Sequence, residues 1–246
     1  MLKGILVASG KGGTGKTSLT GGVGASLALL GKQVLCLDGD VGLRNLDITL
    51  GMTDAALMDF SDVMAGRCDL SRAAVPHPTV SGLHLLTAPL TLPGDFPGEA
   101  GFQALLQQAR EAYDYVLIDS PAGLGPGFRL AVCGADRAIV VAVSDPSSLR
   151  DAQRVVTQLS QLETIHLVVN RVRPRLLRRQ NTTIDDAMDT AGLPLLGLVP
   201  EDPKVVLAAT EGRPLAQLGA RRGAVRAYEN IARRLTGQPV PLMGLR

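Results

Sequence analysis

The chain has 246 residues, 46% of them hydrophobic, which is enough for one sizeable buried core and is typical of one domain or at most two. Its 25 Lys and Arg residues against 23 Asp and Glu residues leave a net charge of +2, so there is no strong general attraction to nucleic acid or to an anionic membrane. Aromatic residues make up 3% of the chain and Trp is absent, which argues against base stacking.

The sequence also favours a cytoplasmic protein. No apolar run approaches the ~20 residues that a membrane-spanning helix needs. The first apolar run is short and lacks the basic flank of a signal peptide. The three cysteines are far apart, so their spacing supports neither a metal cluster nor a disulfide framework.

Short apolar runs alternate with helical patterns along the chain. The predicted strands are residues 4–8, 34–37, 83–87, 115–118, 138–143, 166–169 and 195–199. The predicted helices include residues 17–30, 102–112, 147–159, 203–210 and 221–235. Several strand runs are apolar throughout, as expected for strands covered on both faces. This order predicts an α/β fold, a mostly parallel twisted sheet flanked by helices on both faces. The domain is expected over residues 1–236, with a surface loop at 89–101 and a short tail at 237–246.

Residues 10–17, GKGGTGKT, match the pattern G-x-x-x-x-G-K-[ST] without a mismatch, between a predicted strand and a predicted helix. Glycines let successive backbone N–H groups curl around phosphate oxygens, and the helix that follows points its positive end at them. Lys16 is expected to neutralise the β- and γ-phosphates, and the Thr17 hydroxyl to bind Mg²⁺. The sequence therefore predicts a P-loop ATPase that binds ATP or ADP with Mg²⁺. The expected phosphate-binding residues are Gly12, Gly13, Thr14, Gly15, Lys16, Thr17 and Ser18.

Charged side chains near the predicted strand ends are further candidates. Lys11 is a second lysine in the loop; it is either a solvated cation or a group that stabilises phosphate charge in its own site or in a facing copy. Asp119 follows a buried run, in the place of a Walker B acid that binds Mg²⁺ directly or through water. Asp38 and Asp40 follow the second strand. They are either turn-forming carboxylates or, for Asp40, a group that orients the attacking water or holds the Mg²⁺ shell.

Asn170 and Arg171 follow the predicted strand at 166–169. An Asn side chain has donors and acceptors, which suits the edge of an adenine, and a simple turn residue is the equally weighted alternative.

Residues 11–17, KGGTGKT, resemble the deviant Walker A motif of the MinD/ParA ATPases. Residues 38–47 resemble the switch I segment of the MinD branch, and residues 119–123 resemble its switch II segment. Residues 147–151 and 199–202 are similar to MinD segments as well. The resemblance covers roughly residues 1 to 235, and the two switch matches are specific to the MinD branch and its nearest relatives.

This resemblance implies roles for individual residues. Lys11 reaches across a dimer to the partner's nucleotide, Asp40 positions the hydrolytic water, and Asp119 acts through Mg²⁺. The nucleotide-binding set then also includes Asn170, Arg171, Pro200, Glu201 and Asp202.

The resemblance also implies a cycle. It consists of ATP-driven homodimerisation, recruitment to the inner face of the cell membrane, binding of the division inhibitor MinC, and release after hydrolysis stimulated by MinE or another partner. Such a cycle positions the cell-division site. The tail departs from the amphipathic membrane helix of the MinD branch, since residues 237–246 contain two prolines, Gly244 and a single cation, so weak membrane binding is expected.

Two alternatives within the superfamily stay open. One is a ParA-type partition ATPase that binds DNA through arginines near the end of the chain, Arg221, Arg222, Arg226, Arg233 and Arg234. The near-neutral charge and the switch segments argue against DNA binding, and an ordinary solvated helix face explains these arginines. The other is a flagellar-number ATPase. That group commonly carries an N-terminal extension, whereas Met1 leads here straight into the first strand.

Overall fold

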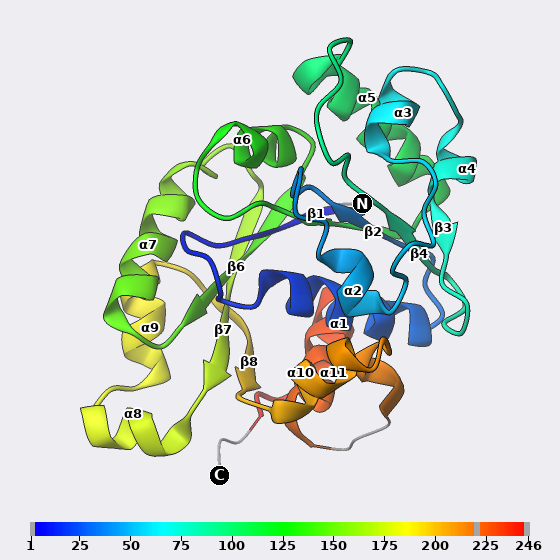
Figure 1. Ribbon diagram of the computed structural model, residues 1–246. Helices are drawn as coiled ribbons and strands as arrows, with labels where there is room; N and C mark the ends of the chain where they lie inside the picture. Colours follow the sequence, from blue (N-terminus) through cyan, green and yellow to red (C-terminus); the bar gives the residue numbers. More distant parts are fainter. Residues whose placement is uncertain (1–2, 219–221, 244–246) are drawn as a thin grey trace.

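The computed structural model describes residues 3–218 and 222–243. Over these residues the chain forms one eight-stranded sheet between two layers of helices (Figure 1). The strands are β1 (Gly4–Ala8), β2 (Val34–Asp38), β3 (Val75–Pro76), β4 (Leu83–Leu86), β5 (Tyr115–Asp119), β6 (Arg137–Val143), β7 (Thr164–Val172) and β8 (Leu195–Pro200). Their order is β3-β4-β2-β5-β1-β6-β7-β8, and all neighbours are parallel except the short edge strand β3, which is antiparallel to β4.

The helices fall into two groups, one on each face of the sheet. In chain order they are α1 (Lys16–Leu29), α2 (Leu46–Leu50), α3 (Phe60–Met64), α4 (Leu70–Ala73), α5 (Gly98–Ala112), α6 (Pro126–Cys133), α7 (Pro146–Thr157), α8 (Pro174–Gln180), α9 (Ile184–Ala191), α10 (Pro203–Thr210), the 3₁₀ helix η1 (Leu215–Leu218) and α11 (Gly223–Leu235). One apolar core joins α1, α2, α10, η1 and α11 to the sheet, and the other joins α3 to α9. Alternate residues of β1 enter the two cores, so the sheet is covered on both sides.

The central strands explain why the predicted fold class is confirmed. β1, β2 and β5 are buried at all five of their positions. A strand covered on both faces needs apolar residues at every position, and these runs have them up to the polar residues at their carboxyl ends. All seven predicted strands are present, and β3 is an addition of two residues that is too short to leave a pattern.

The prediction that residues 89–101 form a loop is wrong for residues 98–101, which belong to a helix. Helix α5 begins at Gly98, with Pro97 as its N-cap residue. A proline directly before the first turn does not interrupt a helix, because the backbone N–H that it lacks has no intrahelical partner there. Helices α6, α8 and α9 were not predicted. They have seven or eight residues each, which is too few for an apolar period to stand out.

Residues after α11 stay attached to the domain as far as the structure describes them. Arg234 donates from Nε and Nη2 to the backbone carbonyl of Val240, at 3.0 and 2.8 Å. Met243 packs against the core that contains α1 and α11. In the two described ranges, 3–218 and 222–243, we find no helix that is long and apolar enough to cross a membrane.

Close packing around α1 depends on two of its glycines. A Cβ atom added at Gly22 would lie 2.2 Å from Cδ2 of Tyr228 on α11, and one added at Gly24 would lie 2.3 Å from Sγ of Cys36 on β2. Tyr228 and Cys36 are both fully buried, so neither has free space to move into. The missing side chains therefore let α1 lie directly against both elements.

We predict that Gly22→Ala lowers the free energy of unfolding. The new methyl group meets the Tyr228 ring, and overpacking of this kind costs about 1–3 kcal/mol, against a gain of about 1 kcal/mol in helix propensity. Given the severity of the overlap, we expect a net loss of about 2 kcal/mol in urea denaturation. Gly94→Ala is the control, because a Cβ at Gly94 meets nothing within 4 Å. A Gly22→Ala protein as stable as the parent would refute this account of the packing.

Candidate functional site

The predicted site residues meet at the edge of the sheet where the parallel strands end. The P-loop, residues 10–17, leaves β1, while Asp119 ends β5 and Asp38 ends β2. Asp38 and Asp119 are direct neighbours in the strand register. Asn170 lies near the end of β7. The chain runs from β1 to β2 on one side and from β5 to β6 on the other, so the edge at β1 and β5 is the topological switch point, where α/β sheets bind ligands.

The backbone of the P-loop is shaped for an anion. Gly13 and Gly15 have φ angles of 77° and 91°, which favour glycine, and a Cβ added at Gly12 or Gly13 would meet no atom within 4 Å. Helix α1 begins at Lys16 with no side chain capping its N-terminus. The buried Thr14 hydroxyl has no hydrogen-bond partner in the described part of the chain. Open space, free N–H groups and an unsatisfied hydroxyl together fit a bound phosphate.

A buried lysine and a buried carboxylate lie behind the loop. Burial lowers the pKa of Lys16, while the carboxylates of Asp119 and Asp40 favour its charged form. Burial also raises the pKa of Asp119 to about 7, against the opposing effect of a hydrogen bond from the Thr17 hydroxyl. Thr20 donates to Asp119 as well, at 3.3 Å. The structure therefore brings Lys16, Thr17 and Asp119 together.

The two acids after β2 have different positions. Asp38 is buried, and its carboxylate accepts hydrogen bonds from the backbone N–H groups of Asp40 at 2.9 Å and Leu46 at 3.1 Å. The turn-forming interpretation thus describes Asp38. Asp40 is only partly buried; burial raises its pKa, and Lys16 opposes that effect. Its carboxylate therefore lies within electrostatic reach of Lys16.

A cavity of about 500 Å³ extends from the P-loop towards β8, within the size range of small-molecule sites. The predicted residues that line it are Gly13, Gly15, Lys16, Thr17, Ser18, Asn170, Arg171, Pro200, Glu201 and Asp202. Gly12 and Thr14 lie on the loop outside its wall. The residues that sequence analysis missed are Pro203, Val205, Val206 and Tyr228, which form an apolar wall. Val206 is 68% exposed, which marks it as a candidate contact, but that exposure is seen only in the fold and the sequence carried no signal for it.

Asn170 and Arg171 fasten β7 to the P-loop. Asn170 Nδ2 donates to the carbonyl oxygen of Thr14 at 2.7 Å, and Arg171 Nη1 donates to that of Gly13 at 3.1 Å. The amide donor of Asn170 is therefore used inside the protein. Contact between its side chain and adenine stays a prediction.

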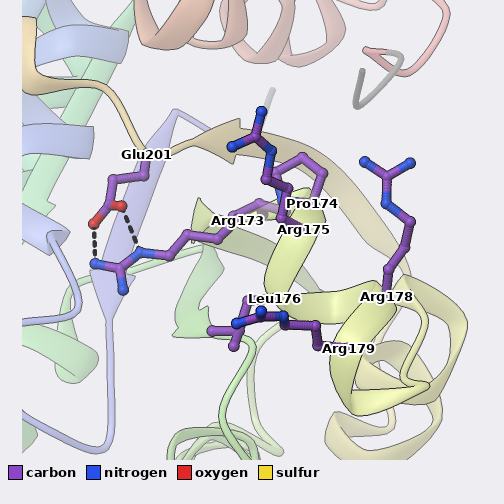
Figure 2. A pocket seen from close by; sticks show the side chains of 8 residues that line it. Arg173, Pro174, Arg175, Leu176, Arg178, Arg179 and Glu201 are labelled. Carbon is purple, nitrogen blue, oxygen red and sulfur yellow. Dashed lines mark hydrogen bonds and ion pairs between the residues drawn. The ribbon is translucent and has the colours of Figure 1, made fainter.

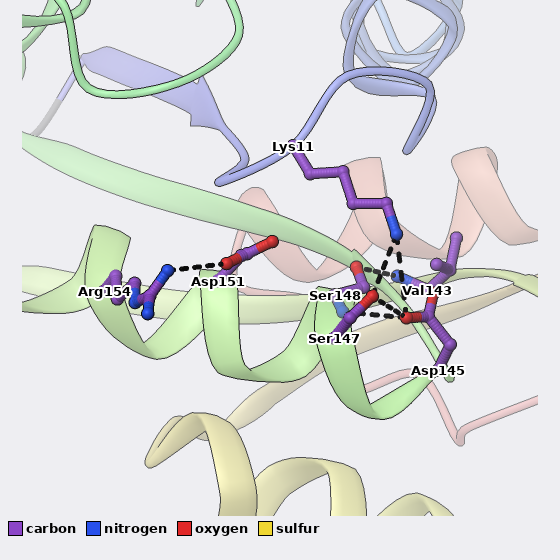
Figure 3. A network of polar contacts seen from close by, with 7 residues as sticks. All are labelled: Lys11, Val143, Asp145, Ser147, Ser148, Asp151 and Arg154. Atoms are coloured by element: carbon purple, nitrogen blue, oxygen red, sulfur yellow. Dashed lines mark hydrogen bonds and ion pairs between the residues drawn. The ribbon is translucent and has the colours of Figure 1, made fainter.

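Lys11 points to a different element. Its Nζ donates to Ser147 Oγ at 3.0 Å and lies 3.7 Å from Asp145 Oδ1, at the start of α7 (Figure 3). Asp145 also accepts from the N–H of Ser148 and so caps this helix. Nearly half of the Lys11 side chain is exposed, and it does not line the cavity. In this structure Lys11 is therefore held at the start of α7, outside the cavity wall.

The donor set suits Mg²⁺ held partly by phosphate. The described residues contain no group of three or more His, Cys, Asp or Glu side chains placed to hold a metal. Mg²⁺ needs only one or two carboxylates when phosphate oxygens and water complete its octahedral shell. The Thr17 hydroxyl and the Asp119 carboxylate provide oxygen ligands of this type, with Asp40 as the further predicted ligand.

We predict that Mg²⁺ affinity in the presence of ADP falls as pH decreases from about 8 to about 6. Below its pKa of about 7, Asp119 is protonated in the metal-free protein, so binding must displace a proton. The dissociation constant from titration calorimetry should rise towards about tenfold per pH unit below 7. In Asp119→Asn the phosphates of ADP still titrate, but residue 119 has no carboxyl group. The Mg²⁺ affinity of this variant should therefore be lower and should depend less on pH. Equal slopes for the two proteins would contradict the prediction.

Comparison with known proteins agrees with this geometry. The family described as "CobQ/CobB/MinD/ParA nucleotide binding domain" matches residues 5–215. The septum site-determining protein MinD of Bacillus subtilis is 40% identical over 246 residues, which cover 98% of this chain and 91% of that protein. MinD of Synechocystis is 39% identical over 242 residues, covering 97% and 91%.

Solved structures give the same result. A chain of the MinC:MinD cell division protein complex of Aquifex aeolicus matches with a TM-score of 0.91 and 36% identity, over 98% of each chain. MinD complexed with Mg-ADP from Pyrococcus horikoshii matches with a TM-score of 0.83 and 28% identity, over 96% of each chain. A ParA family ATPase from Chlorobium tepidum, at 19% identity and a TM-score of 0.79, shares the fold alone.

The predicted resemblance is thereby confirmed at the level of family and branch. The matched region includes the P-loop and the strand ends that carry Asp40, Asp119 and Asn170. This chain belongs to the CobQ/CobB/MinD/ParA nucleotide-binding family and is a Mg²⁺-dependent P-loop ATPase of its MinD branch.

Proposed function

We propose that this chain is an ATP-driven switch that places the cell-division site by dimerising with ATP and recruiting a division inhibitor similar to MinC. The observation that carries the proposal is the position of Lys11, a P-loop lysine that does not line its own nucleotide cavity. A cation that lies outside its own cavity can act in the site of a facing copy. The MinC partner is supported by the similar Aquifex chain, whose structure was solved in a MinC:MinD complex.

Lys11 can leave its contacts at small cost. Its ion pair with Asp145 is long and about half exposed on both sides. Exposed pairs of this kind contribute about 0–1 kcal/mol, so a polyphosphate is a far stronger partner. The contact with α7 therefore acts as a weak resting position.

The roles within each copy follow from charge and burial. Thr17 and Asp119 would hold a Mg²⁺ ion, which would supply positive charge to offset that of the phosphates. Lys16 is buried beside the loop and neutralises phosphate charge from the protein side. Asp40 is partly exposed and lies within electrostatic reach of Lys16, where its carboxylate can accept a proton and hold the attacking water in line.

Exposed leucines support a dimer face near switch I. The N–H of Gly42 donates to the carbonyl of Pro89 at 3.1 Å, so the loops after β2 and β4 lie side by side. On these loops Leu43, Leu90 and Leu92 are 66%, 65% and 48% exposed. Apolar side chains gathered in this way are characteristic of interfaces, and a second copy would cover them.

The ParA-type alternative is less well supported by the charges on α11. Arg226 and Arg233 both form ion pairs with Glu229, and Arg234 is bound to two backbone carbonyl groups. Arg221 lies outside the described residues. A helix face on which two arginines are paired with Glu229 and a third is held by carbonyl groups makes a poor phosphate-binding surface, so the absence of DNA binding stays our prediction.

We predict that Asp40→Ala is a dimer in Mg-ATP by light scattering and hydrolyses ATP at least about tenfold more slowly than the parent, because it keeps the phosphate contacts but lacks the water-orienting carboxylate. Lys11→Ala should stay monomeric in Mg-ATP, although it still binds nucleotide in its own cavity. Lys16→Ala is the control for nucleotide binding and should bind ATP poorly. A monomeric Asp40→Ala protein, or a parent that is dimeric in ADP, would remove the basis for an ATP-driven switch.

Attachment to the inner face of the cell membrane is the finer part of the proposal, together with hydrolysis stimulated by a partner such as MinE. The tail from Gly237 has few apolar side chains, and two of its groups are held to the domain, the Val240 carbonyl and Met243. Burying one such side chain in an apolar site contributes at most about 1.5–3 kcal/mol. One tail is therefore a weak anchor, and a dimer with two tails gains from high effective concentration.

We predict that Asp40→Ala pellets with anionic vesicles better in ATP than in ADP. On that background, Leu242→Asp and deletion of residues 239–246 should each reduce pelleting, because both remove apolar surface from the tail. Leu57→Asp is the matched control: Leu57 is 93% exposed and Leu242 is 52% exposed, but Leu57 lies far from the tail in sequence. If pelleting is the same in ATP and ADP and is unchanged by the tail variants, the tail is not a membrane anchor. That result would not bear on the ATP-driven dimer.

A further inference from the structure

A groove rich in arginine lies beside the nucleotide cavity, between the end of β7 and α8 (Figure 2). Five of the nine residues from 171 to 179 are arginines, and no acidic residue occurs until Asp185. In a chain whose net charge is +2, this is a strong local concentration of one sign. The arginines are Arg171, Arg173, Arg175, Arg178 and Arg179.

Three of these arginines have no acidic partner. Arg173 forms a bidentate ion pair with Glu201, and Arg171 donates to the P-loop carbonyl of Gly13. The remaining three, Arg175, Arg178 and Arg179, are exposed and form no ion pair with any described carboxylate. Arg226 and Arg233 on α11 pair with a glutamate on their own helix, whereas α8 contains no acid at all.

The unpaired arginines border a concave surface. Four arginines line the groove together with Pro174 and Leu176, and its volume is about 990 Å³. Figure 2 shows Arg175 and Arg178 extending from α8 in the same direction, as expected for positions three apart on a helix. Leu176 is 38% exposed and offers an apolar contact between the charged groups.

We propose that this groove binds a short acidic peptide segment of a partner protein. Guanidinium groups bind carboxylates bidentately, and an extended segment with acidic and apolar side chains matches both the arginines and Leu176. An extended polyanion fits less well, because α9 follows after three residues and begins with the exposed acids Asp185 and Asp186. A planar bilayer cannot follow a concave surface, and no aromatic side chain lines the groove for base stacking.

The groove is connected to the nucleotide cavity through Glu201, which lines both. A peptide carboxylate that takes over Arg173 releases Glu201 from its ion pair and changes the wall of the nucleotide cavity. Peptide and nucleotide then affect each other's affinity by the same factor. This coupling rests on the proposed nucleotide-binding function, whereas peptide binding itself does not.

The first test measures binding of a fluorescein-labelled peptide of glutamate and leucine to the full chain by fluorescence anisotropy, with a glutamine-for-glutamate peptide alongside. We expect binding that weakens with salt and a glutamine peptide that binds at least about tenfold more weakly. Arg175→Glu combined with Arg178→Glu should weaken binding of the acidic peptide by about tenfold or more. The matched control is Arg72→Glu combined with Arg150→Glu, two exposed arginines without an ion pair in the described structure, which should change affinity by about twofold or less.

Equal losses in the two double variants would overturn the proposal, because the attraction would then be general. It is also overturned if the α8 variant leaves peptide binding unchanged but abolishes binding to phosphatidylglycerol-containing vesicles or to duplex DNA, since the groove would then be a membrane or nucleic-acid site. Binding of a fluorescent ADP analogue is measured in every variant. A parent that fails to bind ADP would refute the proposed function while leaving the peptide result readable.

The second test concerns coupling. Saturating acidic peptide should change ADP affinity by about threefold or more in the parent protein, and by less than about 1.5-fold in Arg173→Gln, which cannot exchange Glu201 for a peptide carboxylate. If saturating peptide leaves the ADP affinity of the parent protein unchanged, the coupling through Glu201 is wrong.

Discussion

A lysine and a carboxylate that are both buried within electrostatic reach of each other at the carboxyl edge of the sheet are the constraint on which the site depends. Burying Lys16 disfavours its charge, and burying Asp119 disfavours the charge of that group, so each needs the other and the hydroxyls around them. Neither group can move without leaving the other uncompensated. The start of α1 and the end of β5 are thereby fixed against each other before any ligand arrives.

The neighbouring loops are built around this fixed pair. Asp38 uses its carboxylate to hold the turn that carries Asp40, and the N–H of Gly39 donates to the carbonyl of Asp119 at 2.9 Å. From the other side, Asn170 holds the P-loop through the Thr14 carbonyl. These polar groups form hydrogen bonds within the protein. The groups that remain to bind phosphate are the loop N–H groups, Lys16 and the hydroxyls. Preorganisation of this kind lowers the cost of ordering the site when nucleotide binds.

The sequence was sufficient to predict those features that depend on residues close together in the chain. The P-loop combines a fixed spacing with a strand before it and a helix after it, and the buried strands are apolar throughout, so the fold class and the positions of Lys16 and Asp119 could be predicted. The partner of Asn170 could not, because it lies 156 residues away in the chain and only the fold brings the two together. The apolar wall from α10 and α11 was missed for the same reason.

The arginines of α11 and α8 show what could and what could not be predicted from the sequence. Arg226 and Arg233 lie three and four residues from Glu229 on one helix, so their neutralisation follows from helical spacing and could be read from the sequence. Residues 171–179 have no acid at such a spacing, which was a usable signal, but α8 was too short to be predicted as a helix. Only the fold shows that these arginines border a groove and that Glu201 comes from β8 to meet one of them.

Buried side chains that hold the scaffold and exposed side chains that form weak contacts have different roles in the proposed switch. The interior contacts of Lys16, Asp119 and Asn170 are buried and would be costly to break, so nucleotide binding cannot work by rearranging them. The contacts of Lys11 with Asp145 and of Arg173 with Glu201 lie outside the buried part of the site and are exposed, so water screens them. Phosphate, a second copy or an acidic partner can therefore exchange these outer contacts without disturbing the inner ones. Under the two proposals above, a change at the nucleotide would be transmitted to the surface through these ion pairs, while the sheet and the P-loop stay in place.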